Sequence, residues 1–129
     1  MSKEKAFGYH LTMDLYGCDP KKMSSLDVSY NYLNTLPDIM KVHRQSPPFV
    51  VVTDAKRFPD KAGISGWIPI VESGCSVHTL VPTRFITIDV YSCKKFDQKK
   101  IKEFTKKTFS PKKIEDKFFL RGENYGSIK

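Results

Sequence analysis

The sequence of 129 residues lacks the features that mark several classes of protein. No apolar run approaches the roughly 20 residues of a membrane span, and no repeat, linker or low-complexity segment is present. It has only three cysteines, Cys18, Cys75 and Cys93, whose odd number and spacing fit no zinc or redox motif. We therefore expect no metal site, and we expect three buried, reduced thiols in a cytoplasmic protein.

The composition fits one folded domain over residues 1–129. Hydrophobic residues make up 40% of the chain and aromatic residues 12%, which is typical of a globular protein and not of a disordered one. The opening segment, Met1-Ser2-Lys3-Glu4-Lys5, is polar and carries both signs of charge. We expect neither a signal peptide nor a membrane anchor there.

Positive charge is concentrated in the last third of the chain. The net charge is +8, and residues 94–129 hold 12 Lys and Arg against 5 Asp and Glu. A basic segment can bind nucleic acid or an anionic surface. Its lysines come in doublets such as Lys99-Lys100, without the interleaved aromatic and arginine residues or the motifs of nucleic-acid-binding proteins. We therefore expect a solvated helix face there and no nucleic-acid partner.

Hydrophobic periodicity predicts an α+β fold. Alternation and β-branched runs predict strands at 7–15, 49–53, 65–71, 75–80, 84–92 and 114–120. Helical spacing predicts one helix with the apolar stripe Leu26, Tyr30, Leu33 and Leu36, and a second with Ile101, Phe104 and Phe109. This order of elements predicts a two-layer sandwich, in which a mainly antiparallel sheet carries helices on one face.

Some residues also indicate where these elements begin, break or end. Asp19, followed by Pro20, and Asp97 are suited to begin the two helices. Pro37 predicts a break or kink in the first helix. Pro69 predicts that strand 65–71 lies at a sheet edge or carries a bulge.

The dipeptide Glu72-Ser73 has the composition of a self-cleaving peptide bond. A serine hydroxyl can attack the carbonyl that precedes it and turn that amide into an ester. The step needs a strained or mobile turn and a hydrogen-bond donor for the oxyanion. Gly74 would supply backbone freedom, and the hydroxyl of Ser65 could donate to the oxyanion.

A base and an acid would complete such chemistry. His78 has a pKa near neutrality and could remove the Cα proton of residue 73, so that the ester is eliminated. The dehydroalanine left behind hydrolyses to a pyruvoyl group. Its ketone forms a Schiff base with a substrate amine and accepts electrons when CO2 leaves. Cys93 could then protonate the resulting carbanion.

Plainer interpretations of the same residues stay open at this point. A Glu-Ser pair occurs by chance about once in two chains of this length. A lone histidine on a strand is more often structural, and a cysteine at a strand end more often packs. Ser73 and His78 are five residues apart, so on one continuous strand they face opposite sides. They can meet only if Ser73 lies in a turn, which Ser73-Gly74 permits.

The sequence resembles the short, prokaryotic-type S-adenosylmethionine decarboxylases, which depend on a self-made pyruvoyl group. The resemblance runs from about Gly8 to Gly122. It is carried by Gly8-Tyr9-His10-Leu11, Tyr16-Gly17-Cys18-Asp19, Gly63-Ile64-Ser65-Gly66, Glu72-Ser73, Val77-His78-Thr79, Ile88-Asp89-Val90-Tyr91-Ser92-Cys93 and Arg121-Gly122. The spacings from Ser65 to Cys93 fit the family without a gap.

This resemblance implies a role for each candidate residue. Ser73 is the pyruvoyl precursor, and cleavage at 72/73 gives a beta chain of residues 1–72 and an alpha chain of residues 73–129. Ser65 and His78 serve processing, and Cys93 is the proton donor in decarboxylation. The pyruvoyl group from Ser73 is then the only cofactor. The family also implies a homodimer with active sites near its interface.

The nucleoside pocket of that family is only partly matched. Family members usually follow His-Thr with Trp-Pro-Glu, whose acidic residue suits the ribose hydroxyls, whereas no carboxylate stands at Pro82 here. Phe58 matches the aromatic residue that faces the adenine and sulfonium, and Cys75 stands at a usually apolar position. We take Phe58 and Cys75 as candidate substrate-binding residues.

Three functions remain open from the sequence. The first is decarboxylation of S-adenosylmethionine, which gives the aminopropyl donor for spermidine synthesis. The second is the same pyruvoyl chemistry on ornithine or arginine. The third is an unprocessed, non-catalytic relative that binds another protein or nucleic acid. Cleavage of the chain separates the third function from the other two.

Overall fold

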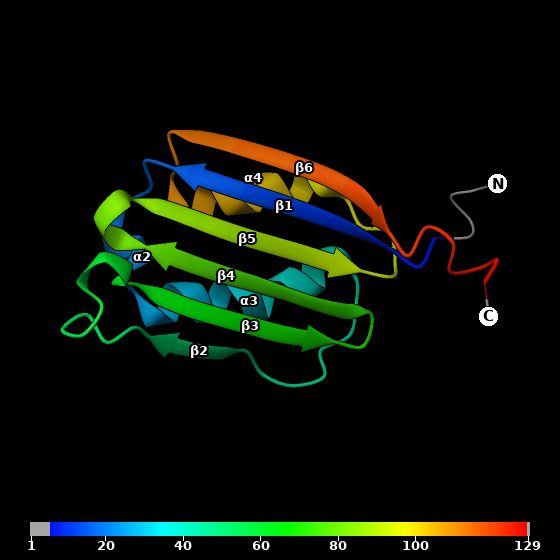
Figure 1. The fold of residues 1–129 in the computed structure, drawn as a ribbon, viewed down its shortest axis with the longest axis horizontal. Coiled ribbons are helices and arrows are strands. Elements are labelled where there is room, and N and C mark those ends of the chain that lie inside the picture. Colours follow the sequence, from blue (N-terminus) through cyan, green and yellow to red (C-terminus); the bar gives the residue numbers. More distant parts are fainter. Residues whose placement is uncertain (1–5, 129) are drawn as a thin grey trace.

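The computed structural model describes residues 6–128. One antiparallel sheet of six strands, in the order β2-β3-β4-β5-β1-β6, forms a layer, and the helices pack on one of its faces (Figure 1). The strands are β1 (Gly8–Tyr16), β2 (Phe49–Val52), β3 (Ile64–Ile70), β4 (Ser73–Leu80), β5 (Phe85–Ser92) and β6 (Lys113–Arg121). The helices are α2 (Pro20–Met23), α3 (Leu26–Met40) and α4 (Gln98–Phe109), with 3-10 turns η1 (Pro59–Lys61) and η2 (Val81–Thr83). The predicted α+β sandwich is confirmed, whereas the expectations for Met1 to Lys5 lie outside the described residues.

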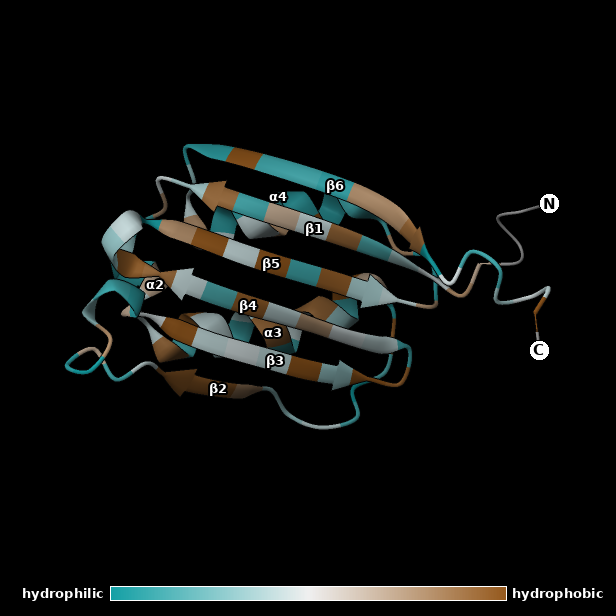
Figure 2. Ribbon diagram, viewed as in Figure 1, coloured by the Kyte–Doolittle hydropathy of each residue, from teal (hydrophilic) through white to brown (hydrophobic). Residues whose placement is uncertain are grey.

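The core lies between the sheet and the helices. Alternate residues of the central strands point into it, and they include Leu11, Met13 and Leu15 of β1 and Ile86, Ile88 and Val90 of β5. The same alternation appears along β5 in Figure 2. Each such side chain contributes about 1.5–3 kcal/mol on burial. The residues between them therefore face the opposite, uncovered side of the sheet.

The three helices begin where side chains cap their free N–H groups. Asp19 accepts a hydrogen bond from Lys21 N, Ser25 from Val28 N, and Asp97 from Lys99 N and Lys100 N. Such caps each stabilise a helix start by about 1 kcal/mol. The predicted helix start at Asp97 is confirmed. Asp19 instead begins the separate short helix α2, and the helix that carries the predicted stripe starts after Ser25. The lysine doublets of α4 lie on its exposed face, opposite Ile101 and Phe109, as expected.

The buried face of α3 differs from the predicted stripe. Leu26 is 41% exposed and Tyr30 is only half-buried, whereas Tyr32 is fully buried. The Tyr32 hydroxyl shares a 2.7 Å hydrogen bond with Thr105 of α4, which satisfies its polar end inside the core. Of the predicted break or kink at Pro37, the break is wrong, because the helix runs on to Met40, and the kink stays a prediction. Pro37 lacks the N–H that would bond the Leu33 carbonyl, and it is buried together with Leu36 and Met40 on the packed face of the helix.

The prediction that Pro69 marks an edge strand is also wrong, since β3 lies between β2 and β4. The partner strand β2 pairs only with 64–67 and stops short of Pro69. The Pro69 carbonyl instead accepts a hydrogen bond of 3.0 Å from Gln45 N. Pro69 therefore lies beyond the end of β2, beside the irregular segment that carries Gln45.

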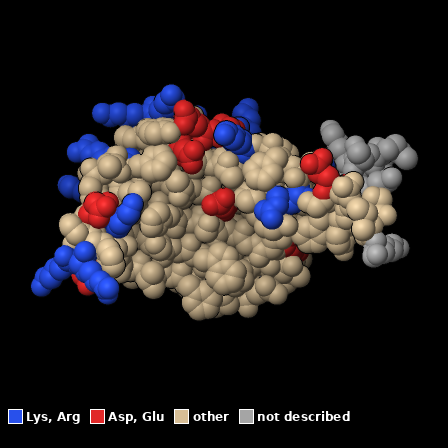
Figure 3. Space-filling model, in the orientation of Figure 1, with Lys and Arg blue, Asp and Glu red and all other residues tan. Residues whose placement is uncertain are grey.

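The uncovered face of the sheet is unevenly charged. Figure 3 views this face: charged side chains gather along its β6 margin and near one end, a few lie near its middle, and the part toward β2 is largely free of them. Exposed apolar side chains lie toward the β2 edge, where the rings of Phe49 and Trp67 stack with centroids 6.2 Å apart. Among residues 6–128, no helix is both long and apolar enough to cross a membrane.

Candidate active site

Glu72 and Ser73 lie at a tight turn between β3 and β4. Ile70 pairs with Ser73, so Val71 and Glu72 are the two loop residues of this hairpin. Ser73 has a φ of +148°, a region that residues other than glycine rarely occupy. Such a conformation costs about 1–3 kcal/mol and persists only where the surroundings impose it. Backbone strain is therefore located at the bond that the sequence predicts to be cleaved.

The carbonyl of Glu72 already accepts a hydrogen bond at the position where an oxyanion would develop. Cys93 N donates to Glu72 O at 2.7 Å, because the β4–β5 pairing of Ser73 with Ser92 brings the next residue alongside. A donor at this distance stabilises charge on that oxygen. The sequence pointed to the Ser65 hydroxyl for this role. Every residue except proline has a backbone N–H, so the residue types in the sequence cannot reveal this donor. Only the strand register could have done so.

Ser65 and His78 form a pair elsewhere on the same hairpin. They face each other across β3 and β4, and Ser65 Oγ lies 2.9 Å from His78 Nδ1. His78 is five residues along β4 from Ser73, a span of about 16 Å at 3.3 Å per residue. The structure thus brings Glu72, Ser73 and Cys93 together, and it keeps the Ser65–His78 pair apart from them within one chain.

Two expectations about the neighbours of Ser73 are corrected. Gly74 has no positive φ; instead, a Cβ there would lie 2.9 Å from Trp67 Nε1, so glycine leaves room for the indole. The expectation of three buried thiols is wrong for Cys93, which lies beyond the end of β5 and is exposed. Cys18 and Cys75 are buried, as expected.

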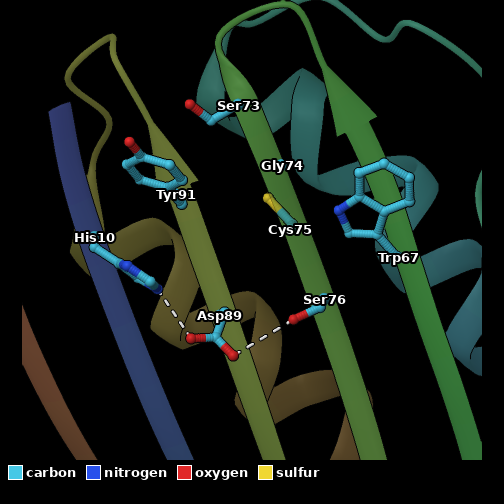
Figure 4. Close-up of a pocket in the computed structure, with 8 residues that line it drawn as sticks. All are labelled: His10, Trp67, Ser73, Gly74, Cys75, Ser76, Asp89 and Tyr91. Carbon is cyan, nitrogen blue, oxygen red and sulfur yellow. Dashed lines mark hydrogen bonds and ion pairs between the residues drawn. The ribbon is translucent and has the colours of Figure 1, made fainter. Parts of the chain in front are cut away.

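A hollow of about 370 Å³ opens beside Ser73 on the uncovered face of the sheet. Its lining, drawn in Figure 4, consists of His10, Trp67, Ser73, Gly74, Cys75, Ser76, Asp89 and Tyr91. The Asp89 carboxylate accepts hydrogen bonds from His10 and Ser76, at 2.9 and 3.4 Å. A carboxylate in the same hollow as the rings of Trp67 and Tyr91 suits a ligand that carries positive charge.

Arg121 fixes the protonation pattern of His10. Its Nη1 lies 3.0 Å from His10 Nδ1, and its guanidinium lies 4.7 Å from the centre of the Tyr91 ring. Arginine can only donate, so His10 Nδ1 accepts and Nε2 donates its proton to Asp89. His10, Asp89 and Tyr91 were not among the sequence candidates. Outward-facing Asp89 and Tyr91, alternating with apolar residues of β5, are the signal that could have found them.

The two candidate substrate-binding residues lie in different surroundings. The Cys75 thiol points into the core, 3.7 Å from Met40 Sδ, and burial raises its pKa to about 12. Phe58 lies in the loop before η1, outside the lining of the hollow, with the Arg57 guanidinium 5.1 Å above its ring. Substrate contacts of both residues stay predictions. Within residues 6–128, no three potential metal ligands cluster.

Comparison with known proteins identifies the family. The family described as S-adenosylmethionine decarboxylase matches residues 9–122. The chain belongs to the S-adenosylmethionine decarboxylase family. The resemblance seen in the sequence is thereby confirmed.

Individual members of this family align along most of the chain. The S-adenosylmethionine decarboxylase proenzyme of Clostridium botulinum (strain Langeland) is 32% identical over 120 residues, covering 92% of this chain and 97% of that one. The proenzyme of Sulfurihydrogenibium sp. is 30% identical over 127 residues, covering 92% and 85%. The crystal structure of the adenosylmethionine decarboxylase from Aquifex aeolicus superposes with a TM-score of 0.77 at 23% identity, covering 92% of each chain. That structural likeness supports the fold.

Proposed function

We propose that this protein decarboxylates S-adenosylmethionine, after cleaving itself between Glu72 and Ser73 into chains 1–72 and 73–129. Its family and its relatives, which are named as proenzymes, support the activity and the self-processing. The observation that carries the cleavage site is the strained Ser73 next to a carbonyl held by Cys93 N. The product would be the aminopropyl donor for spermidine synthesis.

The residues present fit a pyruvoyl group formed from residue 73. Ser73 follows a two-residue turn, its peptide carbonyl is held by Cys93 N, and it lines a hollow large enough for a small ligand. A pyruvoyl group supplies a ketone that condenses with the substrate amine and accepts the electron pair released with CO2.

The first chemical step uses the turn residues Glu72 and Ser73 and the N–H of Cys93. Ser73 Oγ attacks the Glu72 carbonyl carbon, the C–N bond breaks, and the hydroxyl proton passes to the leaving nitrogen. Negative charge develops on Glu72 O, which Cys93 N–H stabilises. Such a donor contributes about 2.7–4 kcal/mol to a step of this kind. Relief of the strained φ at Ser73 also favours the ester.

The second step needs a base near the Cα of residue 73. Removal of that proton expels the Glu72 carboxylate and leaves dehydroalanine, which releases ammonia on hydrolysis and leaves the ketone. His78 of the same chain lies too far along β4 for this task. We therefore propose a homodimer in which a second copy brings its own Ser65–His78 pair to this turn. The part of the uncovered sheet face toward β2, with few charges and with exposed Phe49 and Trp67, is suited to such pairing.

The hollow beside Ser73 suits the charge of the proposed substrate. Asp89 and the rings of Trp67 and Tyr91 would attract a sulfonium or an ammonium group. Cys93 follows Ser92, the partner of Ser73, and its thiol is exposed, which supports its proposed role of returning a proton after CO2 leaves. Phe58 would contact the substrate from the second copy. A free, working thiol also favours the reducing cytoplasm as the location.

Release of labelled CO2 tests this function. The purified protein is incubated with carboxyl-labelled S-adenosylmethionine, ornithine or arginine, each beside the Ser73→Ala variant. Release from S-adenosylmethionine alone, and its loss in the variant, is the expected result. Release from ornithine or arginine instead would assign the same chemistry to a different substrate, as the missing carboxylate at Pro82 allows. No release from any of them would refute the proposal.

A further inference from the structure

A short segment between α3 and β2 runs beside the Glu72–Ser73 turn. Val71 N donates to His43 O at 2.8 Å, and Gln45 N donates to Pro69 O at 3.0 Å. Arg44 forms an isolated antiparallel bridge with Ile70 between these two bonds. Residues 43–45 thus extend the sheet where β2 has ended, and they support the turn that contains the scissile bond.

His43 holds both oxygens of the Glu72 carboxylate. Its backbone N donates to Oε1 at 3.0 Å, and its ring Nδ1 lies 2.7 Å from Oε2. The Glu72 side chain is only 13% exposed, whereas the imidazole is 76% exposed. Burial opposes ionisation of Glu72, but the hydrogen bonds from His43 outweigh it and lower the pKa of this carboxyl. A charged glutamate therefore stands next to the cleavage site with both its oxygens bonded.

The segment that carries His43 is itself anchored to the helix layer. The Arg44 guanidinium binds the Asp38 carboxylate through two nitrogens, at 2.8 and 3.1 Å. Arg44 Nε also donates to Asn34 on the same helix. Paired bonds of this geometry fix direction as well as distance. His43 therefore couples the turn to α3 and does not move freely with the loop.

We infer that His43 is a positioning residue for self-cleavage: it holds the Glu72 side chain so that the Glu72 carbonyl stays on Cys93 N–H while Ser73 attacks. This inference rests on the proposed cleavage at Glu72–Ser73. Glu72 is then fixed at its carbonyl by Cys93 and at its carboxylate by His43. Without the contact between His43 and the Glu72 carboxylate, the turn can rotate. This rotation relaxes the strain at Ser73 and moves the Glu72 carbonyl away from Cys93 N–H.

The rate of precursor cleavage tests this role. Precursors made by cell-free translation are followed over time on denaturing gels. His43→Ala should slow cleavage about tenfold, because a charge-assisted hydrogen bond is lost while the backbone bond to Glu72 stays. His43→Asn should restore the rate to within about threefold, since its amide nitrogen can replace Nδ1. Gln45→Ala, on the same segment but bonded only through its backbone, is the matched control and should cleave at the wild-type rate.

Two further measurements separate positioning from general damage to the fold. Hydroxylamine cleaves esters but not amides, so it should release no fragments from uncleaved His43→Ala precursor. Release would place the defect after ester formation and overturn the inference. In a Glu72→Ala background, the further change His43→Ala should slow cleavage less than twofold, because the partner is already absent. Once His43→Ala has cleaved fully, its kcat for decarboxylation should match that of the wild type.

The outcomes distinguish this inference from the function on which it rests. A wild-type chain that never cleaves would remove the proposed function itself. A wild-type chain that cleaves, with His43→Ala cleaving equally fast, would overturn only the role of His43. Equal slowing in His43→Ala and His43→Asn would overturn the claim that the ring nitrogen is responsible.

Discussion

Replacing Cys93 by proline removes the backbone donor on which the first chemical step depends. Cys93 N lies 2.7 Å from Glu72 O, within the range of about 2.7–3.1 Å for groups that stabilise oxyanions. Proline has no N–H, and the preceding Ser92 is in extended backbone, which is the conformation that a following proline favours. Loss of one such donor typically slows a reaction about 10²–10³-fold. Cleavage of Cys93→Pro should therefore slow by that factor.

The matched control is Cys93→Ala, which lacks the thiol but keeps the N–H. It should cleave at close to the wild-type rate and then decarboxylate poorly, because protonation follows processing. Both variants are followed by denaturing gels over time, and circular dichroism checks that each is folded. If folded Cys93→Pro cleaves as fast as Cys93→Ala, the Cys93 backbone is not an oxyanion donor. If Cys93→Ala fails to cleave, the thiol acts in processing as well.

Three further predictions concern the pocket, the dimer and pH. Asp89→Asn should raise the KM for S-adenosylmethionine about tenfold, with cleavage unaffected, because the hollow loses its negative charge; an unchanged KM would remove Asp89 from the substrate site. Neither the Ser73→Ala variant nor the His78→Ala variant should cleave alone. When the two are unfolded, mixed and refolded together, the His78→Ala chain should cleave, since the Ser73→Ala chain supplies His78 as the base. If no fragments form, the site is not shared between two copies. The pKa of Glu72 is lowered from its ordinary value of 4.5, so its contact with His43 should stabilise the uncleaved Ser73→Ala protein above about pH 4.5, and this stability should be lost as pH falls through the lowered value. Urea unfolding measures the free energy of unfolding at pH 7 and at pH 4, and the difference between the two should become smaller when His43→Ala is added. An equal difference would contradict this linkage.

Local patterns were enough to predict most of the fold. Alternation identified β1 and β5, since one face of each is buried and a period of two is unambiguous there. The stripe of α3 was placed wrongly because Tyr30 and Tyr32 are both aromatic and the sequence cannot show which one meets Thr105. The sequence also could not show that α3 continues past Pro37, because this proline is held by burial beside Leu36 and Met40.

Only those contacts of the candidate site that lie within the β3–β4 hairpin could be predicted from the sequence. Once Val71 and Glu72 are placed in a two-residue turn, Ile70 must face Ser73 and Ser65 must face His78, so this pair follows from the hairpin register. Contacts of Glu72 with Cys93 N and with His43 join segments distant in sequence. Strand order and the path of residues 43–45 determine them, and no residue pattern records either.

The intact mass of the purified protein under denaturing conditions tests the central claim most directly. The account predicts two fragments that meet at 72/73, the second lighter by one ammonia than residues 73–129 with an N-terminal serine. That mass difference would show both the cut and the conversion of Ser73 to a ketone. A single full-length mass with Ser73 unchanged, in protein that is folded, would contradict self-cleavage and the decarboxylation that depends on it.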